Sequence, residues 1–148
     1  PARLTVSGHS AGAHLASYLA ATGAEESTQP FLPAVNGLLL VSGIYDLSGI
    51  PGSFLRDEAK MTSSEAAAWS PLASNQLQGP VRVIAYGAEE TAPFHDQARE
   101  MEVKLRSREP VELLQVPDLN HMNVVLDLAD SEGLLGRRLR DLVERRQS

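Results

Sequence analysis

The sequence contains no cysteine, which excludes a disulfide framework, a thiolate metal site and a cysteine nucleophile. This composition is compatible with a reducing compartment, and we expect a cytoplasmic protein. The sequence also has no apolar stretch near the roughly 20 residues that cross a bilayer, so we expect no membrane partner. Positive charge is scarce, and the formal net charge is -6, which argues against a nucleic-acid partner.

The apolar content is sufficient for one hydrophobic core. The chain has 148 residues, 43% of them hydrophobic, which is the size of a single domain. It begins with Pro1, and residues 3–8 already have the composition of a buried strand. Such a strand normally lies inside a parallel sheet and pairs with neighbours on both sides.

Short apolar runs closed by glycine or by polar loops alternate with segments of helical spacing. We expect an exposed loop over residues 24–33, and a short helix over residues 63–69 with Ser63 or Ser64 as its cap. The predicted strands are residues 3–8, 35–42, 81–86 and 111–116, and the other predicted helices are residues 11–21, 94–106, 124–129 and 133–146. This alternation predicts an α/β fold with a mostly parallel sheet, right-handed crossovers and helices on both faces.

Residues 8–12 read G-H-S-A-G and match the pattern G-x-S-x-G between a predicted strand and a predicted helix. At that position the motif forms a turn so sharp that its serine adopts a positive φ, and glycines on either side avoid clashes. We therefore predict Ser10 as a nucleophile exposed at the carboxyl edge of the sheet. The backbone N–H of Ala11 is the predicted donor to a developing oxyanion.

A serine nucleophile needs a general base, and the sequence offers four histidines. His9 and His14 are too close in sequence to Ser10 to reach its hydroxyl, and His95 begins a helix where we expect it to be exposed. His121 follows the fourth strand, which is where the chain order serine, acid, histidine places the base. We predict His121 as that base.

The base in turn needs a carboxylate to orient it. Glu90 lies on the loop that leaves the third strand, and Glu89 is its immediate rival. Asp46, after the second strand, remains an alternative because some hydrolases carry the acid there. Asp118 is less suitable because it shares a loop with His121. We predict Glu90 as the acid.

The motifs together resemble the kynurenine formamidase (arylformamidase) branch of the α/β hydrolases, which grades into carboxylesterases related to hormone-sensitive lipase. The resemblance covers essentially the whole chain. It rests on G-H-S-A-G-A-H-L-A, S-G-I-Y-D-L, S-P-L, G-A-E-E-T-A-P-F-H-D-Q and L-N-H-M-N-V-V, which begin at residues 8, 42, 70, 87 and 119. It implies an α/β-hydrolase fold with its acid at Glu90, where many relatives have aspartate. Met122 stands where the family usually has phenylalanine.

The resemblance also implies an upstream H-G-G-x-W segment that completes the oxyanion hole, and the sequence contains no such segment. We therefore expect residues 1–148 to form the carboxy-terminal half of an α/β-hydrolase catalytic domain. We expect these residues alone to be a poor catalyst.

The predicted function is a serine hydrolase that cleaves a small ester or an N-formyl arylamide through an acyl-enzyme, with no cofactor and no metal. The alternatives are a general carboxylesterase and a non-catalytic relative that binds a ligand or a partner. Tyr45, Trp69, Phe94 and Met122 are candidates for an aryl or acyl pocket, and core packing is the alternative for each.

Overall fold

The main sheet is parallel and four-stranded. The computed structural model describes residues 3–27 and 35–145. Its strand order is β1 (Leu4–His9), β3 (Val35–Val41), β5 (Val81–Gly87) and β6 (Val111–Val116). All three pairings are parallel, so the carboxyl ends of the four strands meet at one edge. The predicted α/β class and the four predicted strands are confirmed.

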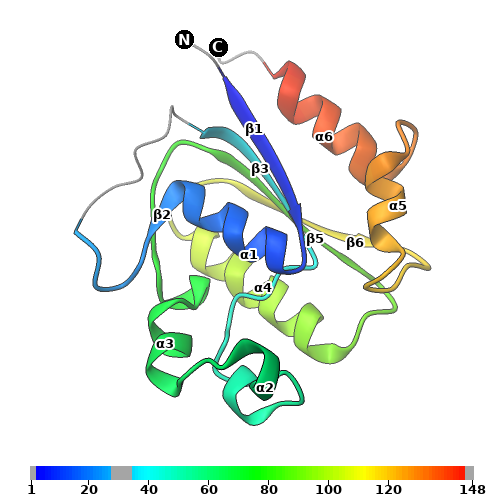
Figure 1. The fold of residues 1–148 in the computed structure, drawn as a ribbon. Coiled ribbons are helices and arrows are strands. Elements are labelled where there is room, and N and C mark those ends of the chain that lie inside the picture. Colours follow the sequence, from blue (N-terminus) through cyan, green and yellow to red (C-terminus); the bar gives the residue numbers. More distant parts are fainter. Residues whose placement is uncertain (1–2, 28–34, 146–148) are drawn as a thin grey trace.

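Helices cover both faces of this sheet, as Figure 1 shows. α1 (Ala11–Ser17) and α4 (Ala92–Arg106) lie on one face, and α5 (Val124–Ala129) and α6 (Leu134–Glu144) lie on the other. The apolar run in β3 supplies both cores: Leu38 and Leu40 pack toward α1 and α4, whereas Leu39 and Val41 pack toward α5 and α6. A strand buried on both faces needs such a continuous apolar run.

The segment between β3 and β5 holds short elements, most of which the sequence did not predict. α2 (Arg56–Ala59) and α3 (Ser63–Ala68) lie between two 3-10 turns, Ile50–Gly52 and Pro71–Ala73. Farther along the chain, β4 (Asn75–Gln76) pairs antiparallel with β2 (Ala21–Thr22), which follows a third 3-10 turn, Tyr18–Ala20. The predicted helix over residues 11–21 is therefore shorter than expected.

Thr62 caps α3, so the expectation of Ser63 or Ser64 as the cap is wrong. The Thr62 hydroxyl accepts a hydrogen bond from the Glu65 backbone N–H at 3.2 Å, and the Glu65 carboxylate accepts one from the Thr62 backbone N–H at 2.8 Å. The reciprocal bonds require a glutamate three residues after the cap, which selects Thr62. The hydrogen bond from the Thr62 backbone N–H is the main cause that lowers the pKa of the Glu65 carboxyl group, and a hydrogen bond from the Thr62 hydroxyl to that carboxylate lowers it further.

Side chains of α4 anchor the segment that leaves the carboxyl end of β3. The Gln97 Oε1 atom accepts the backbone N–H groups of Tyr45 and Asp46 at 2.7 and 3.0 Å. About two turns farther along α4, the Lys104 Nζ donates to the carbonyl of Leu72 at 2.9 Å. α4 therefore bonds to the segment between β3 and β5 at two places, just after β3 and at the 3-10 turn Pro71–Ala73.

β1 lies at one edge of the described sheet. It pairs with β3, and no other strand within residues 3–27 and 35–145 pairs with its second edge. All six of its residues are half-buried. The expected pairing on both sides is therefore seen on one side, with β3.

Of the predicted loop over residues 24–33, residues 28–33 lie outside the described residues. No helix in the described part of the chain is both long enough and apolar enough to cross a bilayer.

A buried arginine secures the start of β5. The Arg82 side chain is 1% exposed and donates to the carbonyl oxygens of Ala20 and Leu77 and to Glu109, with Nη1 3.1 Å from Glu109 Oε1. Burial lowers the pKa of Arg82, and the charge of Glu109 opposes that shift. A guanidinium removed from water depends on its carboxylate partner.

We predict that Glu109→Gln lowers the free energy of unfolding by about 1–3 kcal/mol, because a buried charge loses its counter-ion. Glu112→Gln is the matched control. Glu112 accepts from Arg138, and both of those side chains are more than a third exposed, so its loss should be below about 1 kcal/mol. Urea unfolding of the two variants measures the difference, and equal losses would contradict this account of Arg82.

Candidate active site

Ser10 occupies the predicted turn between β1 and α1. β1 ends at His9, α1 begins at Ala11, and Ser10 between them has φ 57° and ψ -122°. A positive φ is uncommon for a residue other than glycine and is strained. The Ser10 backbone N–H donates to the carbonyl of Val41 at 2.9 Å, at the end of β3. The predicted backbone geometry of this turn is confirmed.

Close approach of the chain to itself requires glycine at position 8. A Cβ atom on Gly8 would lie 2.2 Å from the carbonyl oxygen of Gly12, far inside van der Waals contact. A Cβ atom on Gly12 would have no neighbour within 4 Å among the described residues. The expectation that both flanking glycines avoid clashes therefore holds at Gly8 and is wrong at Gly12.

His121 lies in the loop between β6 and α5 and contacts Ser10. Its Nε2 atom is 3.0 Å from the Ser10 Oγ, and its ring packs against Phe94 with 4.3 Å between the ring centroids. The ring of His9 lies 4.9 Å from that of His121. The His9 Nε2 atom is 2.8 Å from the His121 carbonyl oxygen, and it must donate because a carbonyl only accepts.

Glu90 reaches the other nitrogen of the same ring. Its Oε2 atom is 3.3 Å from the His121 Nδ1 atom, and its side chain is 0% exposed. Its Oε1 atom accepts hydrogen bonds from the Ser42 hydroxyl and from the Gly87 backbone N–H, the latter at 3.0 Å. The buried carboxylate therefore has a hydrogen-bond partner on each oxygen.

The rival carboxylates lie elsewhere. Glu89 is exposed, and Asp118, with φ 58°, is exposed too. The Asp46 carboxylate accepts the backbone N–H of Ser48 at 2.9 Å. Of the four carboxylates considered from the sequence, all within the described residues, Glu90 alone bonds to His121.

Sequence reasoning missed Ser42 and the part played by His9. Ser42 directly follows β3 at the carboxyl edge, a position comparable to that of Glu90 after β5, and this placement was the available signal. His9 forms no described hydrogen bond with the Ser10 hydroxyl, but it donates to the His121 carbonyl on the loop that carries that base.

The predicted oxyanion donor, Ala11, is exposed at the first position of α1, where backbone N–H groups have no acceptor within the helix.

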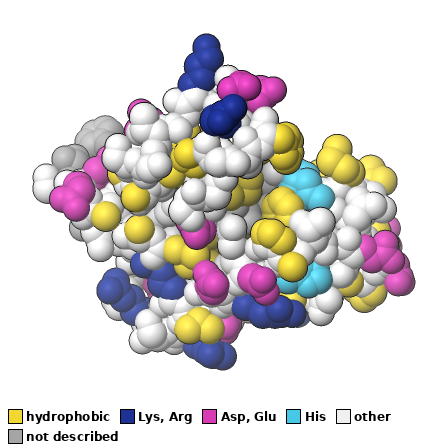
Figure 2. All heavy atoms as spheres, turned by 90° about the horizontal axis from the view of Figure 1, so that it is seen from below, with side chains coloured by type: hydrophobic (Ala, Val, Ile, Leu, Met, Phe, Trp, Pro, Cys, Tyr) yellow, Lys and Arg dark blue, Asp and Glu magenta, His cyan; other side chains and the backbone are white. Residues whose placement is uncertain are grey.

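The remaining candidates divide between core and surface. Tyr45 is fully buried in the core, whereas Met122 is 78% exposed beside His121. Trp69 packs edge-on against Tyr18. His95 was expected to be exposed; instead its Nε2 atom is buried without a partner in the described part of the chain, because its ring packs against Tyr86. Histidine and hydrophobic side chains gather on the face seen in Figure 2, which is viewed from the side of α2.

Glu90 is buried in the interior together with Tyr45. Burial raises the pKa of the Tyr45 hydroxyl far above its usual range, and the negative charge of Glu90 adds to that shift. The Tyr45 hydroxyl has no hydrogen-bond partner among the described residues. Charge–charge interactions are stronger in such surroundings than in water.

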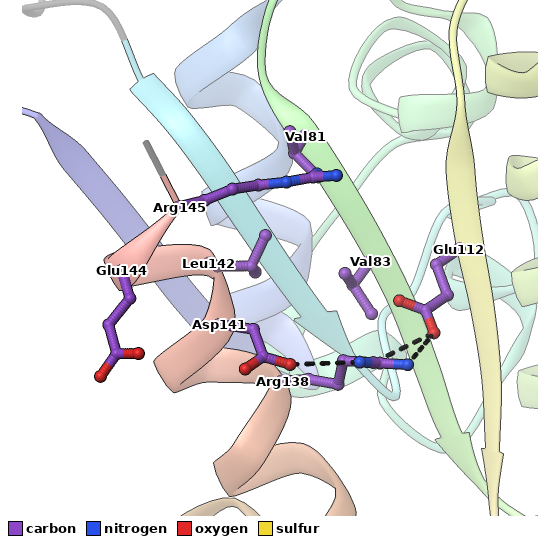
Figure 3. Close-up of a pocket in the computed structure, with 8 residues that line it drawn as sticks. All are labelled: Val81, Val83, Glu112, Arg138, Asp141, Leu142, Glu144 and Arg145. Carbon is purple, nitrogen blue, oxygen red and sulfur yellow. Dashed lines mark hydrogen bonds and ion pairs between the residues drawn. The ribbon is translucent and has the colours of Figure 1, made fainter. Parts of the chain in front are cut away.

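A cavity of about 440 Å³ lies between α6 and the amino ends of β5 and β6 (Figure 3). Arg138, on its wall, is paired with both Glu112 and Asp141, so its charge is already neutralised. Ser10, Glu90 and His121 instead follow the carboxyl ends of β1, β5 and β6. Ligands of open α/β sheets bind at that carboxyl edge. Among the described residues, no group of three or more histidine or acidic side chains is arranged to hold a metal ion.

Comparisons with known proteins identify similar sequences and similar structures. No protein-family model matches the chain. The chain is 33% identical over 139 residues to a kynurenine formamidase from Salmo salar, covering 87% of this chain and 46% of that protein. It is 29% identical over 149 residues to a kynurenine formamidase from Danio rerio, covering 95% of this chain and 49% of that protein. The chain thus spans about half the length of these curated relatives.

Solved structures share the fold. A protein from Silicibacter sp. TM1040 superposes with a TM-score of 0.80 at 22% identity, covering 95% of this chain and 51% of that one. An esterase from Pyrobaculum calidifontis superposes with a TM-score of 0.67 at 17% identity, covering 93% of this chain and 51% of that one.

The fold is that of the α/β hydrolases, as the sequence predicted. In sequence the chain is similar to kynurenine formamidases, and its structural neighbours include esterases.

We predict that Gly8→Ala lowers the free energy of unfolding by about 1–3 kcal/mol, because the added methyl group must displace backbone at Gly12. Gly12→Ala is the matched control within the same motif. It should change stability by less than about 1 kcal/mol, because its methyl group meets no described neighbour and alanine favours a helix. Thermal unfolding of both variants tests this, and a similar loss in each would refute the asymmetry.

Proposed function

We propose that the protein is a serine hydrolase in which Ser10, His121 and Glu90 form a catalytic triad. The observation that carries this proposal is one continuous line of contacts. The Ser10 Oγ lies 3.0 Å from the His121 Nε2, and the His121 Nδ1 lies 3.3 Å from the Glu90 Oε2. The line starts at a serine in a strained strand-to-helix turn and ends at a buried carboxylate, as triad chemistry requires.

In the proposed mechanism the Ser10 Oγ attacks the substrate carbonyl carbon while the His121 Nε2 takes the hydroxyl proton. The tetrahedral intermediate collapses when His121 returns that proton to the leaving amine or alcohol, which leaves an ester between the acyl group and Ser10. Water then attacks this acyl-enzyme with His121 again as base, and the acid product and the Ser10 hydroxyl are released. The Glu90 carboxylate accepts a hydrogen bond from the His121 Nδ1–H and stabilises the imidazolium in both steps.

Ala11 is the proposed oxyanion donor. Ala11 is exposed, and its backbone N–H follows Ser10 directly, which is the position used in such turns. One donor is only part of an oxyanion hole, because each donor contributes about a hundredfold or more to kcat. Further donors are expected from outside the described residues, as the resemblance implies with its H-G-G-x-W segment.

The proposed substrate is an N-formyl arylamide. The relatives at 33% and 29% identity are named kynurenine formamidases, and Phe94 packs directly on His121, where it offers an aromatic surface beside the reacting atoms. The alternative is a small carboxylic ester, which is favoured by the esterase among the structural neighbours. Comparing kcat/KM for N-formylkynurenine and p-nitrophenyl acetate in the intact protein separates the two.

We predict that a fluorophosphonate probe labels the intact protein at Ser10, because the probe reacts with a serine that an adjacent base activates. Ser10→Ala should abolish the label. Ser17→Ala is the control, because Ser17 is a buried serine of α1 whose hydroxyl bonds to the His14 carbonyl. EDTA should leave turnover unchanged. Persistent labelling in Ser10→Ala would assign another nucleophile, and no labelling of the unsubstituted protein would favour the non-catalytic alternative.

We predict that Glu90→Gln lowers kcat about a thousandfold or more, because an amide neither selects the required His121 tautomer nor stabilises the imidazolium. Asp46→Asn is the matched control and should stay near the unsubstituted rate, because Asp46 bonds to Ser48 rather than to His121. Steady-state kinetics on p-nitrophenyl acetate measures both. The reverse pattern would make Asp46 the acid.

A further inference from the structure

We propose that Ser42 is a positioning residue whose hydroxyl holds the Glu90 carboxylate in the orientation that serves His121. This inference rests on the proposed triad and extends it to the end of β3, which supplies none of the three triad residues.

The contacts of Glu90 assign its two oxygens different roles. The Ser42 hydroxyl and the Gly87 N–H both donate to Oε1, whereas Oε2 faces the His121 Nδ1. Ser42 is 1% exposed, so its hydroxyl has no ready exchange with bulk water. Two donors on one oxygen resist rotation of the carboxylate and leave the other oxygen for the imidazole.

The backbone at Ser42 shows what the serine contributes. Ser42 has φ 51°, in a region where glycine fits without strain and other residues are uncommon. Its N–H donates to the carbonyl of Ala85 at 2.7 Å, a bond that glycine would make equally well. A serine at this position is therefore strained where glycine would not be, and the polar group that its side chain adds is a hydroxyl that donates to Glu90.

Loss of the hydroxyl leaves Glu90 buried with one donor fewer. The carboxylate then shifts toward its remaining partners, and its alignment with His121 is less well defined. Among the described residues the Ser42 side chain forms a hydrogen bond with Glu90 and none with Ser10 or His121. We therefore expect the loss of its hydroxyl to lower kcat through the position of Glu90. Substrate binding should be little affected.

The first test uses Ser42→Ala and Ser42→Gly, both of which remove the hydroxyl. Glycine also relieves the strain at φ 51°, so a folding defect caused by alanine at that position is absent from Ser42→Gly. We expect kcat on p-nitrophenyl acetate to fall about 10- to 100-fold in both variants with KM nearly unchanged, as the loss of a hydrogen bond to a charged group predicts. Ser17→Ala, the control for loss of a buried hydroxyl, should retain the unsubstituted rate. A rate near the unsubstituted one in Ser42→Gly, or a loss confined to KM, would overturn the proposal.

The second test is a double-mutant cycle with Glu90→Gln. If Ser42 acts through Glu90, adding Ser42→Gly to Glu90→Gln should reduce kcat by less than about threefold further, because the group it positions is already altered. Full additivity of the two losses would overturn the proposal and assign Ser42 another role. The failure of the triad is distinguishable from the failure of this inference. A Glu90→Gln variant near the unsubstituted rate rejects both, whereas a slow Glu90→Gln with a fast Ser42→Gly rejects only the role of Ser42.

Discussion

The burial of the Glu90 carboxylate is the constraint on which the arrangement of the carboxyl edge depends. A carboxylate withdrawn from water is unstable unless charged or hydrogen-bonding partners replace its hydration. The chain provides those partners from three strand ends: Ser42 after β3, Gly87 at the end of β5 and His121 beyond β6. Parallel pairing brings these ends to one edge, so the sheet topology itself supplies the partners of the buried charge.

The loop that carries His121 is held from two sides. On one side it rests on the end of β5, where a Cβ atom on Gly87 would lie 2.2 Å from the carbonyl oxygen of Leu119. That carbonyl instead accepts the Glu89 N–H at 2.9 Å. On the other side His9 donates to the carbonyl of His121 itself. The distances from His121 to Ser10 and Glu90 are therefore set by backbone contacts as well as by side chains.

Several features that depend on residues close together in the sequence were predicted correctly. The four strands and the turn at Ser10 followed from apolar runs and glycines. The loop after the third strand, together with the family resemblance, favoured Glu90 over Asp46 as the carboxylate beside His121. The β2–β4 pairing was missed because Ala21 meets Gln76, a partner that no short window contains. The contact of Ser42 with Glu90 spans 48 positions, and that of His9 with His121 spans 112. Such contacts depend on how the loops pack, which residue spacing alone does not encode.

The acid is the most buried of the three residues on the line from acid to serine, and this matches the chemistry proposed for it. The Glu90 side chain is 0% exposed and that of His121 is 27% exposed, while Ser10 is half-buried at the surface turn. A fixed negative charge interacts most strongly with an imidazolium where the effective dielectric constant is lowest. A nucleophile, by contrast, must be open to its substrate. The fold meets both requirements by burying the acid on the loop after β5 and placing the serine on the half-buried turn after β1, with the imidazole between them.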